Sequence, residues 1–288
     1  MTLDQILKNA TAKHWAVPHF NISNLEMLKA VVEAAAQLRS PILIGTSEGE
    51  RSFLGIKQTV ALINAYREQY KLPIFLNADH TKSVTAAKLA IDAGYSSIHI
   101  DLSKLPYEQN LKGTAEVVAY AKRKNNKVSI EGELGYLATD SSKIYKGKIF
   151  VDPKSFTKPE EAIKFVRATG INRLAPAVGN FHGLAANKKI INFDLVAELR
   201  NKLPKNVSLV LHGGSGSGKE AFVRAVRTGI NNVHVSTELR VAYTETLKKT
   251  LKKNADEMTP YKLTEPSIES VKSKAIEFIK IFGANGKG

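Results

Sequence analysis

The chain has 288 residues, 43% of them hydrophobic, and carries 42 Lys and Arg against 27 Asp and Glu, a formal net charge of +15. This length suits one large domain or two small ones, each with a substantial core. The absence of cysteine excludes disulfides, thiolate metal sites and a cysteine nucleophile. Any metal ion must therefore be held by histidine and carboxylate groups.

No window approaches the roughly 20 apolar residues of a membrane span, and the N-terminal segment lacks the pattern of a secretory signal. We therefore expect a cytoplasmic protein without a membrane partner. Nucleic-acid binding is one explanation of the positive charge, but only 10 of the 42 basic residues are Arg and no nucleic-acid-binding motif accompanies them. A lysine-rich surface without a nucleic-acid partner is favoured, and its field suits small anionic substrates such as sugar phosphates.

Short apolar runs alternate with longer segments of helical period along the whole chain. The expected strands are Ala16–Ile22, Pro41–Ser47, Pro73–His80, Ser96–Ser103, Lys127–Gly135, Arg173–Gly179, Val207–Gly214 and Asn231–Glu238. The expected helices are Asn24–Leu38, Gly55–Tyr70, Ser83–Ala93, Asn110–Lys124, Lys158–Thr169, Asp194–Leu203, Gly218–Thr228, Arg240–Lys253 and Glu265–Phe282. Eight strand–helix units in a chain near the typical ~250 residues predict an α/β fold, a (β/α)₈ TIM barrel.

The barrel is expected to form a single domain over residues 1–282, with an extra C-terminal helix. Residues 283–288 are expected to fray as a disordered tail. The one unusually long connection, Tyr136 to Phe156, is expected to be functional or mobile.

In this fold the active site lies at the C-terminal ends of the strands. Those ends carry ionisable, metal-binding or anion-binding groups, namely Asn21, Ser47, Asp79, His80, Asp101, Glu131, Glu133, His182, His212 and the run from His234 to Glu238. Any one of them could be structural, an Asp as a helix N-cap for example. Together they favour a site, and three His with a Glu suit Zn²⁺. We expect His99 to be a barrel-interior residue, and His14 and His19 to be structural.

A glycine-rich turn follows the seventh strand, with the sequence HGGSG from His212 to Gly216. Consecutive glycines let backbone N–H groups approach an anion closely, and a helix is expected to begin directly after the turn. Phosphate groups bind after strands 7 and 8 in many barrels. The turn is therefore expected to bind a phosphate.

The sequence resembles the class II, metal-dependent fructose-bisphosphate aldolase family over nearly its whole length. The blocks that carry the resemblance are AVPHFNISNLEMLKAVVEAA, SPILIGTSEG, NADH, DAGYSSIHIDLSKLPYEQN, EGELG, TKPEEAIKFVRATGINRLAPAVGNFHG and LVLHGGSGS, in the family's order. Related members act on tagatose bisphosphate or on a deoxy-keto-phosphogluconate. The resemblance therefore indicates the chemistry more closely than the substrate.

The resemblance implies a role for most of these residues. His80, His182 and His212 would hold a catalytic Zn²⁺, with Asp101 and Glu133 at or beside an alternative position for the metal or a second cation. Asp79 would shuttle the proton of the C4 hydroxyl. The substrate and its phosphate would meet Asn21, Ser47, Gly183, Gly213, Gly214, Ser215, His234, Ser236, Thr237 and Lys262. A homodimer or homotetramer is also implied.

Three segments depart from the family's pattern. In the loop after ELG, Ser141 stands where an acid is expected, and Asp140 is the nearest candidate for that catalytic role. In the last strand His234 replaces an amide. Near the C-terminus Tyr261 stands where the family has an Arg, supplied by a neighbouring subunit, that grips the distal phosphate. Lys262 could replace it only as a point charge.

The expected activity is cleavage of fructose 1,6-bisphosphate to dihydroxyacetone phosphate and glyceraldehyde 3-phosphate, a reaction of glycolysis. One alternative is a diverged enzyme for another phosphorylated ketose, such as tagatose bisphosphate, deoxy-keto-phosphogluconate or a ketose 1-phosphate. The other is a non-catalytic barrel with a relict zinc site.

Overall fold

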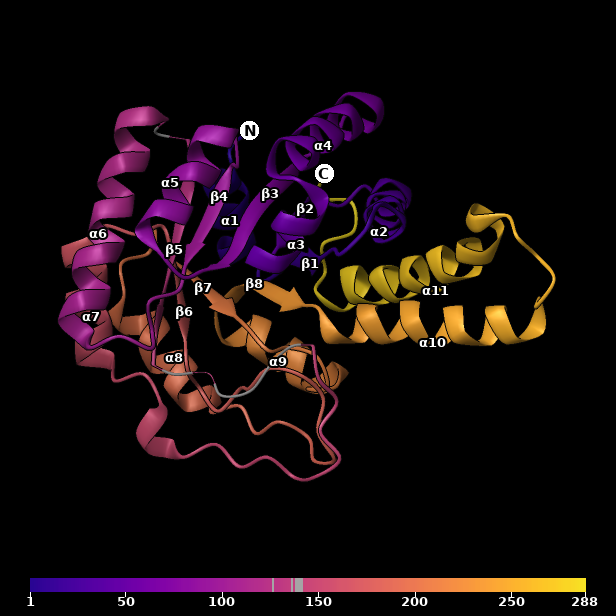
Figure 1. Ribbon diagram of the computed structural model, residues 1–288. Helices are drawn as coiled ribbons and strands as arrows, with labels where there is room; N and C mark the ends of the chain where they lie inside the picture. The colour runs from indigo at the N-terminus through magenta and orange to yellow at the C-terminus, as the bar shows by residue number, and fades with distance from the viewer. Residues whose placement is uncertain (126, 136, 138–141) are drawn as a thin grey trace.

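The computed structural model describes residues 1–125, 127–135, 137 and 142–288. Eight parallel strands form a closed barrel in sequence order, and the last pairs with the first (Figure 1). The strands are β1 (Val17–Asn21), β2 (Ile42–Thr46), β3 (Ile74–Thr81), β4 (Ser97–Ile100), β5 (Ser129–Leu134), β6 (Arg173–Pro176), β7 (Ser208–Leu211) and β8 (Ile230–Val235). The predicted TIM barrel is confirmed.

Helices surround the barrel and cover its outer face (Figure 1). They are α1 (Leu3–Ala12), α2 (Leu25–Leu38), α3 (Glu48–Leu54), α4 (Ile56–Tyr70), α5 (Val84–Ala93), α6 (Tyr107–Lys124), α7 (Pro159–Thr169), α8 (Phe193–Lys202), α9 (Lys219–Thr228), α10 (Thr237–Lys253) and α11 (Pro260–Ile281), with a short 3₁₀ turn at Pro153–Ser155. None of the helices described is both long and apolar enough to cross a membrane.

Two helices lie outside the predicted pattern. Helix α1 begins at a capping box between Thr2 and Gln5 and buries Leu3, Ile6, Leu7 and Ala10, the spacing of one helix face. This face packs against β1, β7 and β8. Helix α3 begins at a second capping box, between Ser47 and Glu50. It is only seven residues long, so its hydrophobic period is too short to be recognised in the sequence.

The interior of the barrel is polar, where TIM barrels usually have Val, Ile and Leu. Arg173 of β6 is fully buried and forms an ion pair with Glu131 of β5, Nη1 to Oε2 2.8 Å. Its guanidinium also donates to Asn232 Oδ1 (3.2 Å), Asn77 Oδ1 (3.5 Å) and Ser97 Oγ. Arg173 therefore connects β6 to β3, β4, β5 and β8 across the barrel.

The predicted interior position of His99 is confirmed, because the side chain is fully buried and contacts carboxylates of β3 and β5. It alternates with Ile98 and Ile100, which lie on the opposite face of β4. One strand thus supplies apolar residues to the helix layer and an imidazole to the polar interior.

Helices α10 and α11 form an antiparallel pair that projects from the barrel (Figure 1). Helix α10 begins at Thr237 rather than at Arg240, so the predicted eighth strand was too long at its C-terminal end. The C-terminal tail after α11, expected to fray, lies on the protein body. Ala284 is fully buried, and the N–H groups of Gly286 and Gly288 donate to the carbonyls of Leu38 and Arg39.

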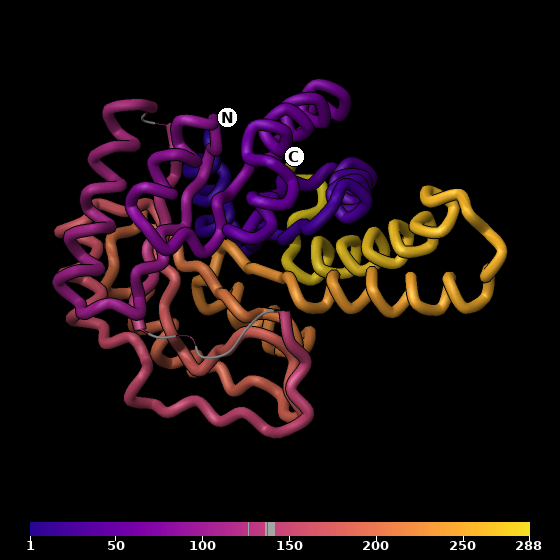
Figure 2. Tube along the Cα trace, viewed as in Figure 1, coloured from indigo at the N-terminus to yellow at the C-terminus, as the bar shows by residue number. Residues whose placement is uncertain are grey.

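There are two long connections on one side of the barrel rather than the single one expected (Figure 2). Beside the segment after β5, residues 177–192 join β6 to α8 without a helix or strand. The two segments pair at Ile144 and Leu184, and Tyr145 N–H donates to Leu184 O at 2.7 Å. The second connection carries His182, so each loop supports the other beside the strand ends.

Candidate active site

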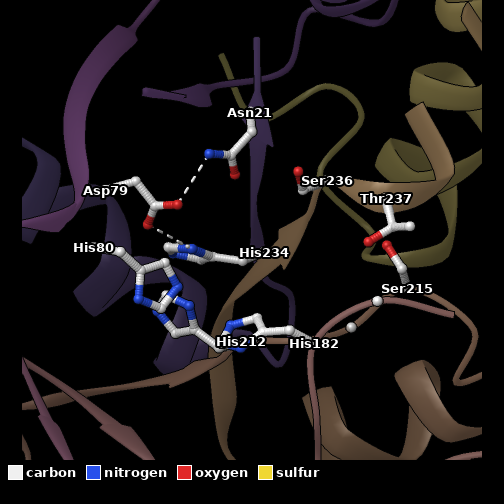
Figure 3. A pocket seen from close by; sticks show the side chains of 12 residues that line it. Asn21, Asp79, His80, His182, His212, Ser215, His234, Ser236 and Thr237 are labelled. Carbon is white, nitrogen blue, oxygen red and sulfur yellow. Dashed lines mark hydrogen bonds and ion pairs between the residues drawn. The ribbon is translucent and has the colours of Figure 1, made fainter. Parts of the chain in front are cut away.

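A pocket lies at the C-terminal ends of the strands, where the fold predicts the active site (Figure 3). It is lined by Asn21, Asp79, His80, His182, Gly183, His212, Gly213, Gly214, Ser215, His234, Ser236 and Thr237. Each of these residues is among the predicted site residues. The structure therefore brings together residues from three strands (β1, β3 and β8), from the segments that follow β6, β7 and β8, and from the start of α10.

Three imidazoles form the centre of the pocket. The ring centroid of His80 lies 4.8 Å from that of His182 and 4.8 Å from that of His212, and the last two are 6.1 Å apart. His80 has a φ of 43°, a left-handed conformation that a non-glycine residue adopts only where its surroundings enforce it. This backbone turn sets the direction of the His80 ring at the end of β3.

Carboxylates orient two of these rings. His80 Nδ1 lies 2.8 Å from Asp101 Oδ2 and 3.9 Å from Glu133 Oε2. His212 Nε2 lies 2.5 Å from Glu131 Oε1. A carboxylate that accepts from one ring nitrogen leaves the other nitrogen as the electron-pair donor, the usual arrangement around metal-binding histidines.

The protonation of the rings fits a metal-binding set. Burial lowers the pKa of His182 to about 3, helped by the nearby charges of His80 and Lys189. Burial, with His99 and His80, also holds the pKa of His212 well below its usual value. Both rings are thus neutral, as a metal ligand must be.

His80 differs from these two rings. Burial lowers its pKa, but Asp79 and the hydrogen bond to Asp101 outweigh burial and raise it. Because the pKa of His80 is raised, a proton competes with a metal ion for its ring nitrogen. The three imidazoles, with Asp101 and Glu133 beside them, form the nitrogen and oxygen donor set that suits Zn²⁺.

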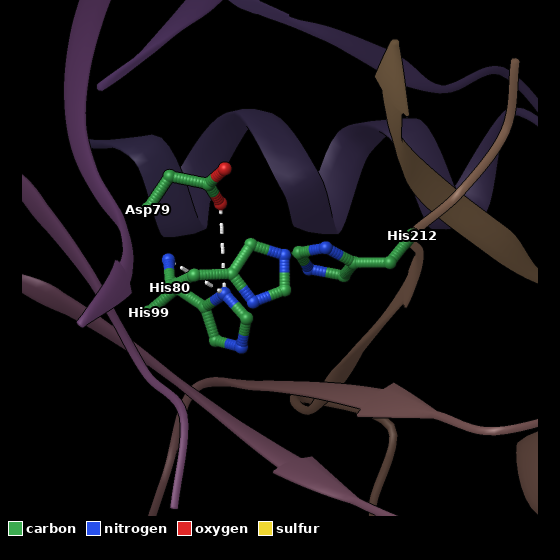
Figure 4. Close-up of side chains that lie close together, drawn as sticks. All are labelled: Asp79, His80, His99 and His212. Carbon is green, nitrogen blue, oxygen red and sulfur yellow. Dashed lines mark hydrogen bonds and ion pairs between the residues drawn. The ribbon is translucent and has the colours of Figure 1, made fainter. Parts of the chain in front are cut away.

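Asp79 lies against His80 and the barrel interior (Figure 4). Its Oδ2 accepts a hydrogen bond from Asn21 Nδ2 at 2.9 Å, and its Oδ1 lies 3.5 Å from His234 Nδ1 and 3.5 Å from His99 Nδ1. Burial would raise the pKa of this carboxyl, but His80, His234 and His99 hold it well below its usual range. Asp79 is therefore a carboxylate at neutral pH and can accept a proton.

His19, expected to be structural, contacts a candidate site residue directly. Its ring stacks on that of His234, with centroids 3.5 Å apart and planes 3° from parallel. The close approach depends on Gly45, because a Cβ there would lie 2.1 Å from His19 Cε1. His19 thus holds the His234 ring beside Asp79.

Ser215 of the HGGSG turn lies on the far side of the pocket from Asp79, with Thr237 next to it (Figure 3). Gly213 has a φ of 59°, and a Cβ there would lie 2.3 Å from Phe181 O, so only glycine fits. Helix α10 begins at Thr237, and its N-terminus carries the partial positive charge of the helix dipole. The turn and the helix end together make an anion-binding corner.

Of the predicted site residues that the structure describes, four do not line this pocket: Ser47, Lys262, Asp101 and Glu133, the last two of which contact His80. Ser47 caps α3, where it exchanges hydrogen bonds with Glu50. Lys262 lies at the start of α11, beyond the 17 residues of α10 that lead away from the pocket, with Nζ 3.4 Å from Glu257 Oε2. Asp140 lies outside the described residues.

Two buried residues support the site without being among the predicted site residues: Glu131, which was expected only as an ionisable group at a strand end, and Arg173. Glu131 holds His212, and Arg173 neutralises Glu131. The alternation in Glu131-Gly132-Glu133 places both carboxylates on the same face of β5. That alternation was the one signal that Glu131 points into the barrel with Glu133.

The fold and the pocket define a class of protein: a TIM barrel with a histidine and carboxylate cluster of metal-binding type beside an anion-binding turn. Comparison with known proteins identifies the family. Residues 1–287 match the family model described as fructose-bisphosphate aldolase class-II. The chain belongs to this family of aldehyde-lyases, as the sequence resemblance predicted.

Individual relatives span the whole chain. A fructose-bisphosphate aldolase of Geobacillus stearothermophilus is 33% identical over 291 residues, covering 100% of this chain and 98% of the relative. The crystal structure of the YdjI aldolase from Escherichia coli K12 superimposes with a TM-score of 0.84 at 29% identity, covering 99% and 98% of the two chains. Fructose-bisphosphate aldolase from Campylobacter jejuni shares the fold, with a TM-score of 0.84 at 20% identity and 99% and 95% coverage.

Proposed function

We propose that this protein is a zinc-dependent aldolase that cleaves fructose 1,6-bisphosphate to dihydroxyacetone phosphate and glyceraldehyde 3-phosphate in glycolysis. The observation that carries the proposal is the grouping of His80, His182 and His212 beside the carboxylate of Asp79, with a glycine turn for phosphate in the same pocket. The family membership and the name of the Geobacillus relative support this substrate.

The residues of the pocket divide the work of the reaction. A zinc ion held by the three histidines would supply a Lewis acid for the ketose oxygens, stabilising the negative charge left when the C3–C4 bond breaks. Asp79 takes the proton of the C4 hydroxyl in cleavage and returns it in condensation. Asn21 keeps Asp79 in position. The Gly213-Gly214-Ser215 turn and Thr237 bind the phosphate of the dihydroxyacetone half.

We expect the purified protein to bind about one equivalent of Zn²⁺, because the imidazoles of His80, His182 and His212 converge in one pocket. Chelation should abolish cleavage. Elemental analysis after zinc reconstitution should show that His182→Ala and His212→Ala lose the metal. His14→Ala is the matched control, since His14 is an exposed histidine. Zinc content that is unchanged in the two pocket variants would rule out this site.

A second ketose is the alternative substrate, and Tyr261 is the observation that favours it. Tyr261 is 68% exposed at the start of α11 and cannot form the forked, charged contact of an Arg with a distal phosphate. Lys262 also lies at the start of α11, so it reaches a pocket only if the projecting α10–α11 pair of one subunit lies over its neighbour. The proposed homodimer or homotetramer would allow this.

The proposed location of the protein is the cytoplasm, as expected from the sequence.

We therefore expect only modest discrimination between fructose 1,6-bisphosphate and fructose 1-phosphate. A single charge-assisted hydrogen bond from Lys262 is worth about 1.5–3 kcal/mol, roughly a 10- to 150-fold preference in kcat/KM. Lys262→Ala should bring the two values together, whereas Lys253→Ala, an exposed lysine at the end of α10, should not. A preference of several thousand-fold that survives Lys262→Ala would mean that another residue binds the distal phosphate.

A further inference from the structure

Lys189, in the connection between β6 and α8, is a buried lysine that neither the sequence pattern nor the pocket lining includes. It is 6% exposed, although lysine is rarely buried without a partner. Its Nζ donates to Gly213 O at 2.5 Å and lies 4.6 Å from the centre of the Phe181 ring. Within the described part of the chain it forms no salt bridge.

Both contacts of Lys189 are with segments that form the pocket. Gly213 follows His212 and lines the pocket, and Phe181 precedes His182. The ammonium group therefore contacts the turn at the carbonyl of Gly213, and Lys189 is not part of the pocket lining. Its hydrogen bond to the Gly213 carbonyl holds the peptide between Gly213 and Gly214 in one orientation. The charge is buried, so water and salt screen it weakly from an anion in the pocket.

We propose that Lys189 is a positioning residue for the substrate phosphate, fixing the Gly213-Gly214-Ser215 turn and supplying positive charge next to it. This proposal rests on the proposed function, because it assumes that the pocket binds a phosphorylated ketose. Lys189 acts through the turn, since it is not among the residues that line the pocket.

The electrostatic surroundings of Lys189 agree with this role. Burial lowers its pKa to about 7, and the carboxylate of Glu238 acts in the opposite direction. Glu238 also accepts from the N–H of Gly216, in the same turn, at 2.7 Å. A phosphate dianion in the pocket adds a second negative charge and favours the protonated amine. A bound phosphate dianion would therefore shift Lys189 towards its ammonium form.

The test compares a substrate that carries the phosphate with one that lacks it. In Lys189→Met, kcat/KM for condensation with dihydroxyacetone phosphate should fall about 10- to 100-fold, the range of a charge-assisted interaction. The value for unphosphorylated dihydroxyacetone should change by less than about twofold, and the zinc content should stay the same. The inhibition constant of inorganic phosphate should rise by a similar factor. Lys188→Met is the matched control, because Lys188 is the exposed neighbour.

Equal losses with the two substrates would overturn the proposal, because they would show that Lys189 only supports the fold of the loop. Unchanged kinetics in Lys189→Met would overturn it as well. If that variant does not fold, Lys189→Gln keeps a donor for Gly213 O without the charge and takes its place. If the wild type turns over no phosphorylated ketose, the proposed function fails. Calorimetric binding of inorganic phosphate to the zinc-loaded wild type and Lys189→Gln still tests Lys189, with equal affinities counting against it.

Discussion

Replacing Asp79 by Ala is expected to lower kcat by about 10²- to 10⁴-fold while zinc stays bound, the range for removal of a well-placed acid or base. Asp79 is 4% exposed and held by Asn21 at 2.9 Å, and His80, His234 and His99 keep it ionised despite burial. It can therefore take a hydroxyl proton at neutral pH. Coupled-enzyme turnover and elemental analysis of the same preparations measure the two quantities.

Asp79→Asn is the second variant, since its amide keeps the size of the side chain but cannot take a proton. Both variants should lose activity to a similar extent. Asp92→Ala is the matched control, because Asp92 is an exposed aspartate that pairs with Lys124 on the surface. Turnover within about threefold of the wild type in Asp79→Asn would exclude Asp79 as the acid or base. Loss of zinc in the variants would instead make it a metal-site residue.

The sequence predicted the pocket well because the fold itself determines where strand ends meet. Once Asp79, His80, His212 and His234 were placed at the ends of parallel strands, the barrel rule brought them together. The helix and strand periods were sufficient for that step, even though β8 was predicted too long and α3 was missed. His182 lies on a loop, and its proposed role as a metal ligand comes from the family resemblance.

The sequence could not predict contacts across the interior of the barrel. Arg173 of β6 meets Glu131 of β5 and residues of β3, β4 and β8, and these pairings depend on strand stagger and tilt. The stacking of His19 on His234 depends on the same stagger. Lys189 was missed for another reason: nothing local distinguishes it from its exposed neighbour Lys188.

Arg173→Leu is expected to lower the free energy of unfolding by about 3–5 kcal/mol, the usual cost of removing one partner from a buried ion pair. The substitution leaves Glu131 in the barrel interior without its counter-ion, and Asn77, Ser97 and Asn232 without their donor. Leucine is also smaller than arginine and leaves part of the interior unfilled. Urea unfolding with chelator present, for wild type and variant alike, measures the change without a contribution from bound metal.

The matched control is Arg167→Leu, which removes an exposed arginine from α7 and should change the free energy of unfolding by less than about 0.5 kcal/mol. Adding Glu131→Gln to Arg173→Leu should recover part of the loss, because an amide is less costly to bury without a counter-ion than a carboxylate. The same double variant should still bind zinc less tightly than the wild type, since Glu131 holds His212. A loss below about 1 kcal/mol in Arg173→Leu would mean that the ion pair contributes little to the stability of the barrel.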